Sequence, residues 1–397
     1  MKWNIEKKYE ICAAPSQAPY LGRTAGGDLL LLHANFCDCM PGCHLTLRRS
    51  TDGGHTWGQP EMTVEPSIEG AGVEGSFSCL GDLAFIAYLE GCDLKRHPFN
   101  PTRCWIMRST DGGRHWSGPQ SLDGAGAAMM PSGKIIRLRN NGRLLLPAWG
   151  FVGWLNRAGG NPHNYILASD DEGLSWHLHA RIRKDPATQG VEMCEIALCE
   201  LLDGRLLTIM RGDSHNPDAF AYSFRSISED GGKTWSPAAP TNISVCEPRL
   251  VVTEDQPLLL VARSWPGNRH LWYRPLGEHE REPGSGQTET LAAEELDESR
   301  TPVSDYGVML FTSNDDGQTW EPLLTMQNPR DLKLSDENDR QMRHRYQAGF
   351  PDVLVLDRDR LMVVFRQPDP GVQVDRPGLT YSHTFQRFVA ANIIVRQ

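Results

Sequence analysis

The stretch Ser50-Thr51-Asp52-Gly53-Gly54-His55-Thr56-Trp57 carries the pattern S-x-D-x-G-x-x-W, which occurs five times in the 397 residues of the chain. The other four copies occupy residues 109–116, 169–176, 228–235 and 313–320. The central aspartates of successive copies are separated by 59, 60, 59 and 85 residues. A regular period near 60 residues indicates a repeat architecture in which each copy marks one structural unit.

Each copy has the composition of a tight turn between two strands. The serine and aspartate side chains can hydrogen-bond nearby backbone groups, and the glycine adopts positive φ without steric cost. The tryptophan that follows is large enough to pack between neighbouring units and to bury a large apolar area. We therefore expect the repeated residues to build the scaffold and not to carry catalysis.

This pattern is the Asp box, and the chain resembles the sialidase (neuraminidase) superfamily from about residue 14 to residue 365. The resemblance implies a six-bladed β-propeller with four antiparallel strands per blade. The repeat arithmetic agrees, because removing the 25-residue surplus of the last interval leaves 372 residues, or about six units of 60. We predict an all-β chain with one sialidase-like propeller domain over residues 1–397. The sixth blade should combine C-terminal strands with an N-terminal strand, which closes the ring.

Short apolar runs bounded by glycine and charged residues predict buried strands between the turns. Examples are residues 28–32, 142–146, 204–207 and 360–365. The segment at about 277–305 breaks the period and is rich in glutamate, glycine and serine, which predicts a mobile, charged surface insertion. A lid or a subunit contact at the rim is the alternative for this segment.

Charge and composition limit the partners and the location that we expect. The formal net charge of −10 argues against a nucleic acid partner, but it leaves room for a local basic site that binds an acidic sugar. No membrane span is predicted, and the first 20 residues carry charges where a signal peptide needs an apolar core. Ten cysteines at irregular spacing suggest free thiols. We expect a cytoplasmic protein, or a secreted or periplasmic one if a leader was removed. Its expected partner is a carbohydrate, and the sequence favours no particular oligomeric state.

The resemblance implies a catalytic aspartate shortly before the first Asp box, and Asp38 is the matching residue. Its neighbours Phe36, Cys37 and Cys39 are apolar or carry thiols, so the pKa of this carboxyl can be raised enough for a general acid. The alternative is an aspartate that only caps a loop.

The resemblance also implies a glutamate that activates the nucleophile and precedes a strand ending in arginine. In the run 194–211, Glu195 matches that glutamate, and Arg211 matches one arginine of the triad that binds the substrate's carboxylate. Arginine suits this task because its planar guanidinium pairs with a carboxylate in a bidentate manner. The structural alternative is that Glu195 only forms a salt bridge with a nearby arginine.

Two positions depart from the family pattern. Gln17 stands where the family has its first arginine, and Phe350 occupies the position of the nucleophilic tyrosine. Phenylalanine cannot attack an anomeric carbon, so Tyr346, four residues earlier, is the candidate substitute. Water activated directly by Glu195 is the other option, and it predicts an inverting enzyme.

The remaining arginine of the triad has three candidates, Arg249, Arg263 and Arg269. The run 263–269 lies where the family often places this residue, which favours Arg263 or Arg269.

A rival site overlaps the position of Asp38. The cluster C-x-C-x₃-C-H can bind zinc, and its members are Cys37, Cys39, Cys43 and His44. The spacing differs from the common paired C-x₂-C form, so we expect reduced thiols on a tight loop, with no metal and no cofactor.

Through the resemblance, these residues predict an exo-acting glycoside hydrolase of the sialidase type that cleaves a terminal acidic sugar, either sialic acid or a related ulosonic acid. Asp38 would protonate the leaving oxygen, Glu195 would activate Tyr346 or a water, and Arg211 would hold the acidic group. Two alternatives remain open because fold does not determine function. One is a propeller glycosidase or lyase acting on a different sugar, and the other is a carbohydrate-binding propeller without catalysis.

Overall fold

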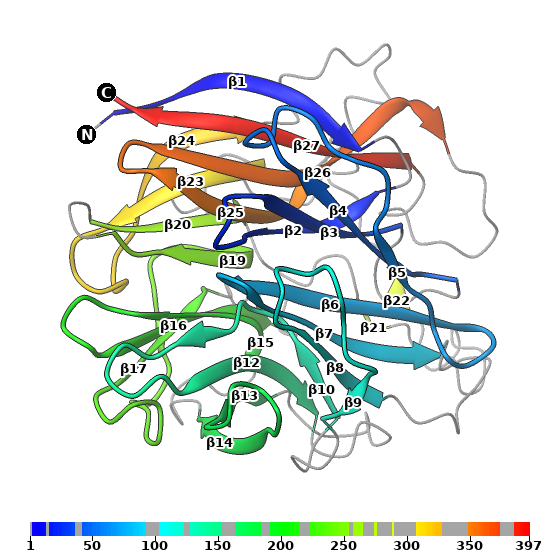
Figure 1. The fold of residues 1–397 in the computed structure, drawn as a ribbon. Coiled ribbons are helices and arrows are strands. Elements are labelled where there is room, and N and C mark those ends of the chain that lie inside the picture. The colour runs from blue at the N-terminus through cyan, green and yellow to red at the C-terminus, as the bar shows by residue number, and fades with distance from the viewer. Residues whose placement is uncertain are drawn as a thin grey trace.

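The structure is a computed structural model in which all regular elements of the described residues are β-strands (Figure 1). The strands form six small antiparallel sheets arranged as a six-bladed β-propeller, which confirms the predicted fold class. Within the described part of the chain, no helix is long and apolar enough to cross a membrane. The described residues are 2–12, 16–35, 42–92, 103–122, 128–151, 163–183, 191–214, 222–253, 257–264, 274–275, 288–289, 307–327, 348–373 and 385–397.

In blades 1 to 5 the strands of a blade follow one another in the sequence, and the first of them lies innermost. Blades 1 and 2 contain β2 (Gln17–Arg23), β3 (Leu29–Ala34), β4 (Leu45–Ser50) and β5 (Met62–Val64), then β6 (Ala71–Leu80), β7 (Leu83–Cys92), β8 (Arg103–Ser109) and β9 (Gln120–Ser121). Blades 3 and 4 contain β10 (Ala128–Pro131), β11 (Ile136–Arg137), β12 (Leu144–Phe151), β13 (His163–Ser169) and β14 (His177–Ile182), then β15 (Val191–Glu200), β16 (Leu206–Ser214), β17 (Phe224–Ser228) and β18 (Ala239–Pro240). Blade 5 contains β19 (Val245–Val251), β20 (Leu258–Ser264), β23 (Gly307–Ser313) and β24 (Glu321–Gln327).

Blade 6 closes the ring by joining the two ends of the chain. Its strands are β25 (Gly349–Asp357), β26 (Arg360–Gln373), β27 (Phe385–Arg396) and, outermost, β1 (Trp3–Cys12). The strands β1 and β27 pair antiparallel, so the two termini lie side by side in Figure 1. The predicted closure by an N-terminal strand is therefore confirmed. Because the third and fourth strands of this blade come from opposite ends of the chain, no turn joins them, which explains why six blades carry five Asp boxes.

Each Asp box forms the turn between the third and fourth strands of its blade. In the first box the Ser50 hydroxyl donates to Asp52 Oδ1 at 2.8 Å and accepts the Gly54 N–H at 2.8 Å. Asp52 Oδ1 also accepts the Thr56 N–H at 2.9 Å. The same three hydrogen bonds recur in the other four boxes. Hydrogen bonds from Thr56 hold the pKa of Asp52 well below its usual range, so this carboxylate serves the turn and is no proton donor at neutral pH.

Apolar side chains fill the spaces between neighbouring blades. In the described residues, six apolar clusters lie at the six interfaces, and each Asp-box tryptophan packs against the preceding blade. Trp320, for example, is fully buried between blades 4 and 5. This confirms the scaffold role predicted for the repeated tryptophan.

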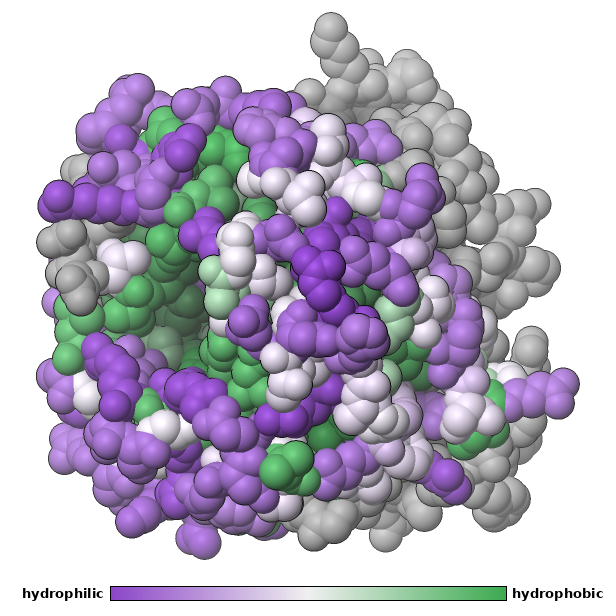
Figure 2. Space-filling model, viewed as in Figure 1, coloured by the Kyte–Doolittle hydropathy of each residue, from purple (hydrophilic) through white to green (hydrophobic). Residues whose placement is uncertain are grey.

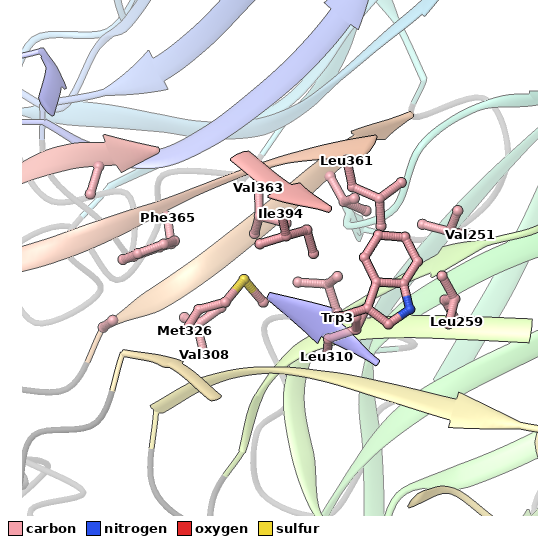
Figure 3. Close-up of a cluster of buried hydrophobic side chains, with 14 residues drawn as sticks. Trp3, Val251, Leu259, Val308, Leu310, Met326, Leu361, Val363, Phe365 and Ile394 are labelled. Carbon is pink, nitrogen blue, oxygen red and sulfur yellow. The ribbon is translucent and has the colours of Figure 1, made fainter. Parts of the chain in front are cut away.

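The interface between blades 5 and 6 has no Asp-box tryptophan, and Trp3 of β1 fills it instead (Figure 3). Trp3 is 2% exposed and belongs to the same cluster as Leu310, Met326 and Ile394. The N-terminal strand therefore contributes both the last strand of the ring and the missing aromatic wedge.

The outer surface is mostly hydrophilic, and on the face in Figure 2 apolar residues show mainly inside a hollow. The large apolar residues that stand exposed in the described part of the chain are Leu174, Leu178 and Leu202. The surplus residues of the last repeat interval lie between β20 and β23 of blade 5, where β21 (Arg274–Pro275) and β22 (Thr288–Glu289) pair with each other. The rest of the predicted insertion at 277–305 lies outside the described residues.

Candidate active site

The innermost strands of four blades are irregular at the same place. In each of these blades the register between the first and second strands shifts near the start of the first strand, at Gln17/Tyr20 in β2, Met193/Ile196 in β15, Cys246/Arg249 in β19 and Gly349/Asp352 in β25. A bulge of this kind bends the strand and redirects its side chains, and bulges are common beside active sites. The equivalent positions in four blades define one end of the ring of inner strands.

Three of these bulges hold a residue other than glycine at positive φ. Ala18, Glu247 and Phe350 have φ of 43°, 54° and 50°, and a proline follows each of them. Such a conformation costs on the order of 1–3 kcal/mol and persists only where surrounding contacts hold it. Strained residues at equivalent places on several blades point to this end of the ring as the functional one.

Glu195 and Arg211 form an ion pair in blade 4. The Arg211 Nη1 donates to Glu195 Oε1 at 3.1 Å, between the bulge of β15 and the facing strand β16. Their side chains are 18% and 23% exposed, so both are accessible to a small molecule. The structure therefore brings together the two residues identified in the run 194–211, and their salt bridge is the contact that the structural alternative for Glu195 predicts.

Glu247 in the bulge of β19 links three blades. Its N–H donates to Glu195 Oε2 at 2.7 Å, and its own Oε2 accepts the N–H of Phe350 at 2.5 Å. Its Oε1 lies 2.9 Å from Arg263 Nη2, and the Glu247 side chain is 3% exposed. Because both Glu247 oxygens are engaged, one by Arg263 and the other by the Phe350 N–H, this side chain positions Arg263 and the bulge of blade 6.

Phe350 and Arg366 form the blade 6 side of the cluster. The Arg366 guanidinium lies over the Phe350 ring, 4.7 Å from its centroid, in a cation–π arrangement. Arg366 stands on β26 opposite Gly349, the residue before Phe350. A Cβ on Gly349 would lie 3.3 Å from Glu247 Oε2, 3.4 Å from Arg263 Cδ and 3.4 Å from Arg366 Nε. These three side chains therefore converge on one point, which only the absence of a side chain at Gly349 leaves open.

Burial raises the pKa of the Glu195 carboxyl above its ordinary value. The guanidinium of Arg211 acts in the opposite direction, and the nearby carboxylate of Glu247 adds to the rise. A carboxyl whose pKa lies above its usual range can exchange protons closer to neutral pH, which is what a general base or acid requires.

A second polar layer lies one step further along the inner strands. Asp352 is fully buried, and its Oδ2 accepts the Leu21 N–H at 2.6 Å and lies 2.8 Å from Lys134 Nζ. Its Oδ1 lies 3.4 Å from Arg249 Nε. Lys134 comes from the break between β10 and β11 of blade 3, and it also donates to the backbone of blades 1 and 6. This layer ties opposite blades together, and Arg249 belongs to it.

The outcome for the predicted residues is mixed. The structure brings Glu195, Arg211, Arg263 and Phe350 into one cluster, and it engages Arg249 with Asp352 instead. The predictions for Asp38, Tyr346 and Arg269 concern residues outside the described ones, as do Cys37 and Cys39 of the zinc alternative. The backbone of Gln17 lies at the bulge of β2, and its side chain is not described. In the described part of the chain, no group of three or more His, Cys, Asp or Glu could hold a metal ion.

Two residues of the cluster, Glu247 and Arg366, were missed at the sequence level, although each carried a signal. Arg211, Arg263 and Arg366 all end an apolar run on the second strand of their blade, so this feature marks Arg366 as well as the two arginines that the resemblance identified. Glu247 precedes a proline on an inner strand, as do Ala18 and Phe350.

Comparison with known proteins places these features in a wider group. Residues 95–386, well over half of the chain, match the family described as BNR repeat-like domain. A protein of unknown function from Dyadobacter fermentans DSM 18053 is similar in structure, with a TM-score of 0.68 and 17% identity over 100% of this chain and 99% of that one.

Two glycosidases with different substrates are also similar in structure. The α-L-arabinanase of Penicillium chrysogenum, solved with arabinobiose, has a TM-score of 0.60 and 13% identity over 98% of both chains. The sialidase of Trypanosoma rangeli, solved with the inhibitor DANA, has a TM-score of 0.58 and 15% identity over 96% of this chain and 55% of that one, so the chain spans about half of that sialidase. At these identities the likeness shows the fold alone. The family match shows that the chain belongs to the BNR repeat-like domain family, and the likeness in fold agrees with the resemblance to sialidases read from the Asp boxes.

Proposed function

We propose that this protein is an exo-acting glycoside hydrolase of the sialidase type, which removes a terminal sugar carrying an acidic group from a glycoconjugate. The observation that supports this proposal most directly is the accessible Glu195–Arg211 pair, set beside Arg263 at the bulged end of the inner strands. A carboxyl with a raised pKa next to guanidinium groups combines a proton-transfer group with a site for an anion.

Each residue has a separate part in the proposed reaction. Arg211 and Arg263 bind the acidic group and fix the sugar with its anomeric carbon near Glu195. Asp38 protonates the leaving oxygen, as the resemblance implies. Glu195, in its ionised form, takes a proton from the attacking group, which is either a water or the hydroxyl of Tyr346. Phe350 has no hydroxyl, so its ring cannot be the nucleophile.

The two nucleophiles predict different products. Attack by water in one step inverts the anomeric carbon, whereas attack by a tyrosine forms a covalent intermediate and retains it in two steps. The resemblance assigns the position of the family's tyrosine to Phe350, and this favours water and inversion.

A second candidate is a propeller glycosidase for a neutral sugar. Glu195 and Glu247 each pair with an arginine, so part of the positive charge at the site is neutralised by the protein itself. The similar fold of an α-L-arabinanase gives this candidate a precedent.

A substrate panel on the purified protein tests the proposal. The panel pairs sialosides and other ulosonic acid glycosides with uronic acid glycosides and with neutral glycosides, including arabinosides. We expect release of an acidic sugar, with inversion seen by NMR of the first-formed product. Cleavage of neutral glycosides alone would favour the second candidate, and no cleavage of any member would leave a binding propeller. Retention with an adduct on Tyr346 would overturn the assignment of water as the nucleophile.

A further inference from the structure

Three consecutive blades present an arginine from their second strand at the same end of the ring. Arg211 lies on β16 opposite the bulge of β15. Arg263 and Arg366 lie on β20 and β26, each directly opposite the residue that precedes the bulge of its inner strand. The described part of β2 offers no arginine at its bulge, because Gln17 and Ala18 stand there. The arginine that the resemblance leads us to expect in blade 1 is thus absent, and one that it does not lead us to expect is present in the neighbouring blade 6.

The geometry connects Arg366 to the rest of the cluster. Its Nε and the side chains of Glu247 and Arg263 all lie within 3.3–3.4 Å of the point where a Cβ of Gly349 would be. Arg263 is held by Glu247, and Glu247 in turn is bonded through its N–H to Glu195, the partner of Arg211. Arg366 therefore belongs to the same continuous group as the two arginines already assigned to substrate.

Phe350 holds Arg366 in place from one side. The phenylalanine is fixed by its N–H bond to Glu247 at φ of 50°, and its ring packs against the apolar cluster of blades 1 and 2 that includes Ala18 and Tyr20. The ring therefore lies toward β2, next to the position of Gln17. A guanidinium stacked on an aromatic face keeps the N–H donors along its edge directed within the plane of the group, where a carboxylate can meet them.

We propose that Arg366 is the third arginine that recognises the acidic group of the substrate, in place of the arginine missing at Gln17, and that Phe350 is the platform that orients it. This inference rests on the proposed function, since it assumes that the site takes an acidic sugar. Among the described residues, this group contains three arginines and two glutamates, a composition that suits an acidic ligand better than a basic one. Because Arg366 is only 5% exposed, a small planar carboxylate suits it better than a bulky anion.

Binding of free sugar acids tests the inference without requiring turnover. The probes are N-acetylneuraminate, glucuronate and galacturonate, each titrated by calorimetry beside its methyl ester, which has the same ring without the charge. We compare the wild type with Arg366→Gln, Arg366→Lys and Phe350→Leu. Arg360→Gln is the matched control, because Arg360 lies on the same strand, exposed and paired with Asp357 at the far end.

We expect Arg366→Gln to bind the preferred acid about 10–150-fold more weakly, the range for a lost charged hydrogen bond. Arg366→Lys should recover part of the loss, because lysine keeps the charge but not the bidentate geometry. Phe350→Leu should lower the affinity for the acid to a smaller degree, and Arg360→Gln should bind the acid as tightly as the wild type. Adding Gln17→Arg to Arg366→Gln should restore affinity, which a purely structural role of Arg366 would not produce. Circular dichroism melts identify any variant that is not folded.

The outcomes separate this inference from the proposed function. If the wild type cleaves no glycoside but binds a sugar acid in a way that depends on Arg366, the function fails and the inference stands. If it cleaves an acidic glycoside with the same KM in Arg366→Gln, the function stands and the inference is overturned. The inference is also overturned if the wild type binds none of the three acids, or if Arg366→Gln loses affinity for the acid and for its methyl ester to the same degree.

Discussion

The replacement of Glu195 by glutamine is the sharpest test of the site, because the structure fixes what the substitution removes. Both carboxylate oxygens accept from donors: one from Arg211 Nη1 at 3.1 Å and the other from the N–H of Glu247 at 2.7 Å. Glutamine supplies one acceptor and one donor group, so one of the two neighbours must face an N–H instead of an oxygen. Leaving one such donor unsatisfied costs about 1–3 kcal/mol.

This loss is partly offset by the removal of a buried charge. Since burial raises the pKa of Glu195, the ionised form is disfavoured in the folded protein, and the neutral amide avoids that cost. We therefore expect the free energy of unfolding at pH 7 to fall by less than about 3 kcal/mol, which a propeller of this size tolerates. Turnover should fall about 10²–10⁴-fold, the range for loss of a general base.

The pH dependence has a definite sign. A carboxyl whose pKa is raised in the folded state holds its proton to higher pH than in the unfolded chain. Its stabilising contribution is fully present below the ordinary value of about 4.5 and is lost as the pH rises through the raised value. As a base, Glu195 must be ionised, so the acid limb of kcat/KM should lie above the position of an ordinary glutamate. Both dependences should disappear in Glu195→Gln.

The assay combines denaturant unfolding between pH 4 and pH 8 with kcat/KM on the best substrate of the panel. Glu200→Gln is the matched control, because Glu200 lies at the far end of the same strand β15, where it accepts the Arg139 N–H and pairs with the Arg139 side chain of blade 3. Turnover within a few-fold of the wild type in Glu195→Gln, with an unchanged acid limb, would remove Glu195 from the mechanism.

Three further changes have expected outcomes. Asp38→Asn should lower kcat by two or more orders of magnitude on a substrate with a poor leaving group, and less on an activated aryl glycoside; equal rates of wild type and variant on the poor leaving group would exclude general acid catalysis by Asp38. Trp3→Ala should lower the free energy of unfolding by about 3–5 kcal/mol, measured by urea titration, whereas a surface-like loss below about 0.5 kcal/mol would contradict the wedge role between blades 5 and 6. Gly349→Ala should cost about 1–3 kcal/mol and weaken binding of the acid probe, because its Cβ would press against Glu247, Arg263 and Arg366; calorimetry showing unchanged affinity would mean that this point is not part of the site.

The fold was accessible from the sequence because it is carried by a local motif that repeats. The hydrogen bonds of each Asp box close within seven residues, so the pattern at Ser50, Asp52 and Gly54 needs no information from elsewhere in the chain. Trp3 performs the same packing task without the motif, since its blade is closed by the chain ends and has no turn to mark. A single tryptophan near the N-terminus carries no repeat signal, so its role appears only in the structure.

The site was accessible in part, for a different physical reason. Glu195 and Arg211 lie in one blade, on facing strands that a short turn connects, so their pairing follows from local strand geometry. The contacts of Glu247 and Arg366 cross from blade to blade and depend on bulges that change the register. No periodicity in the sequence reports such a bulge, although a proline after an inner-strand residue marked three of the four.

The bulges and the carboxylates depend on each other. Glu247 and Phe350 both hold a positive φ, and the N–H of each strained residue donates to a carboxylate from the preceding blade: Glu195 for Glu247, and Glu247 for Phe350. A hydrogen bond to an ionised acceptor is about twice as strong as a neutral one, which offsets the strain of the backbone. The same bonds occupy one oxygen of each glutamate and leave the other for an arginine. Three blades are thereby locked into one arrangement, so the spacing of Arg211, Arg263 and Arg366 is set before any ligand arrives, which is the preorganisation that recognition of a small rigid anion requires.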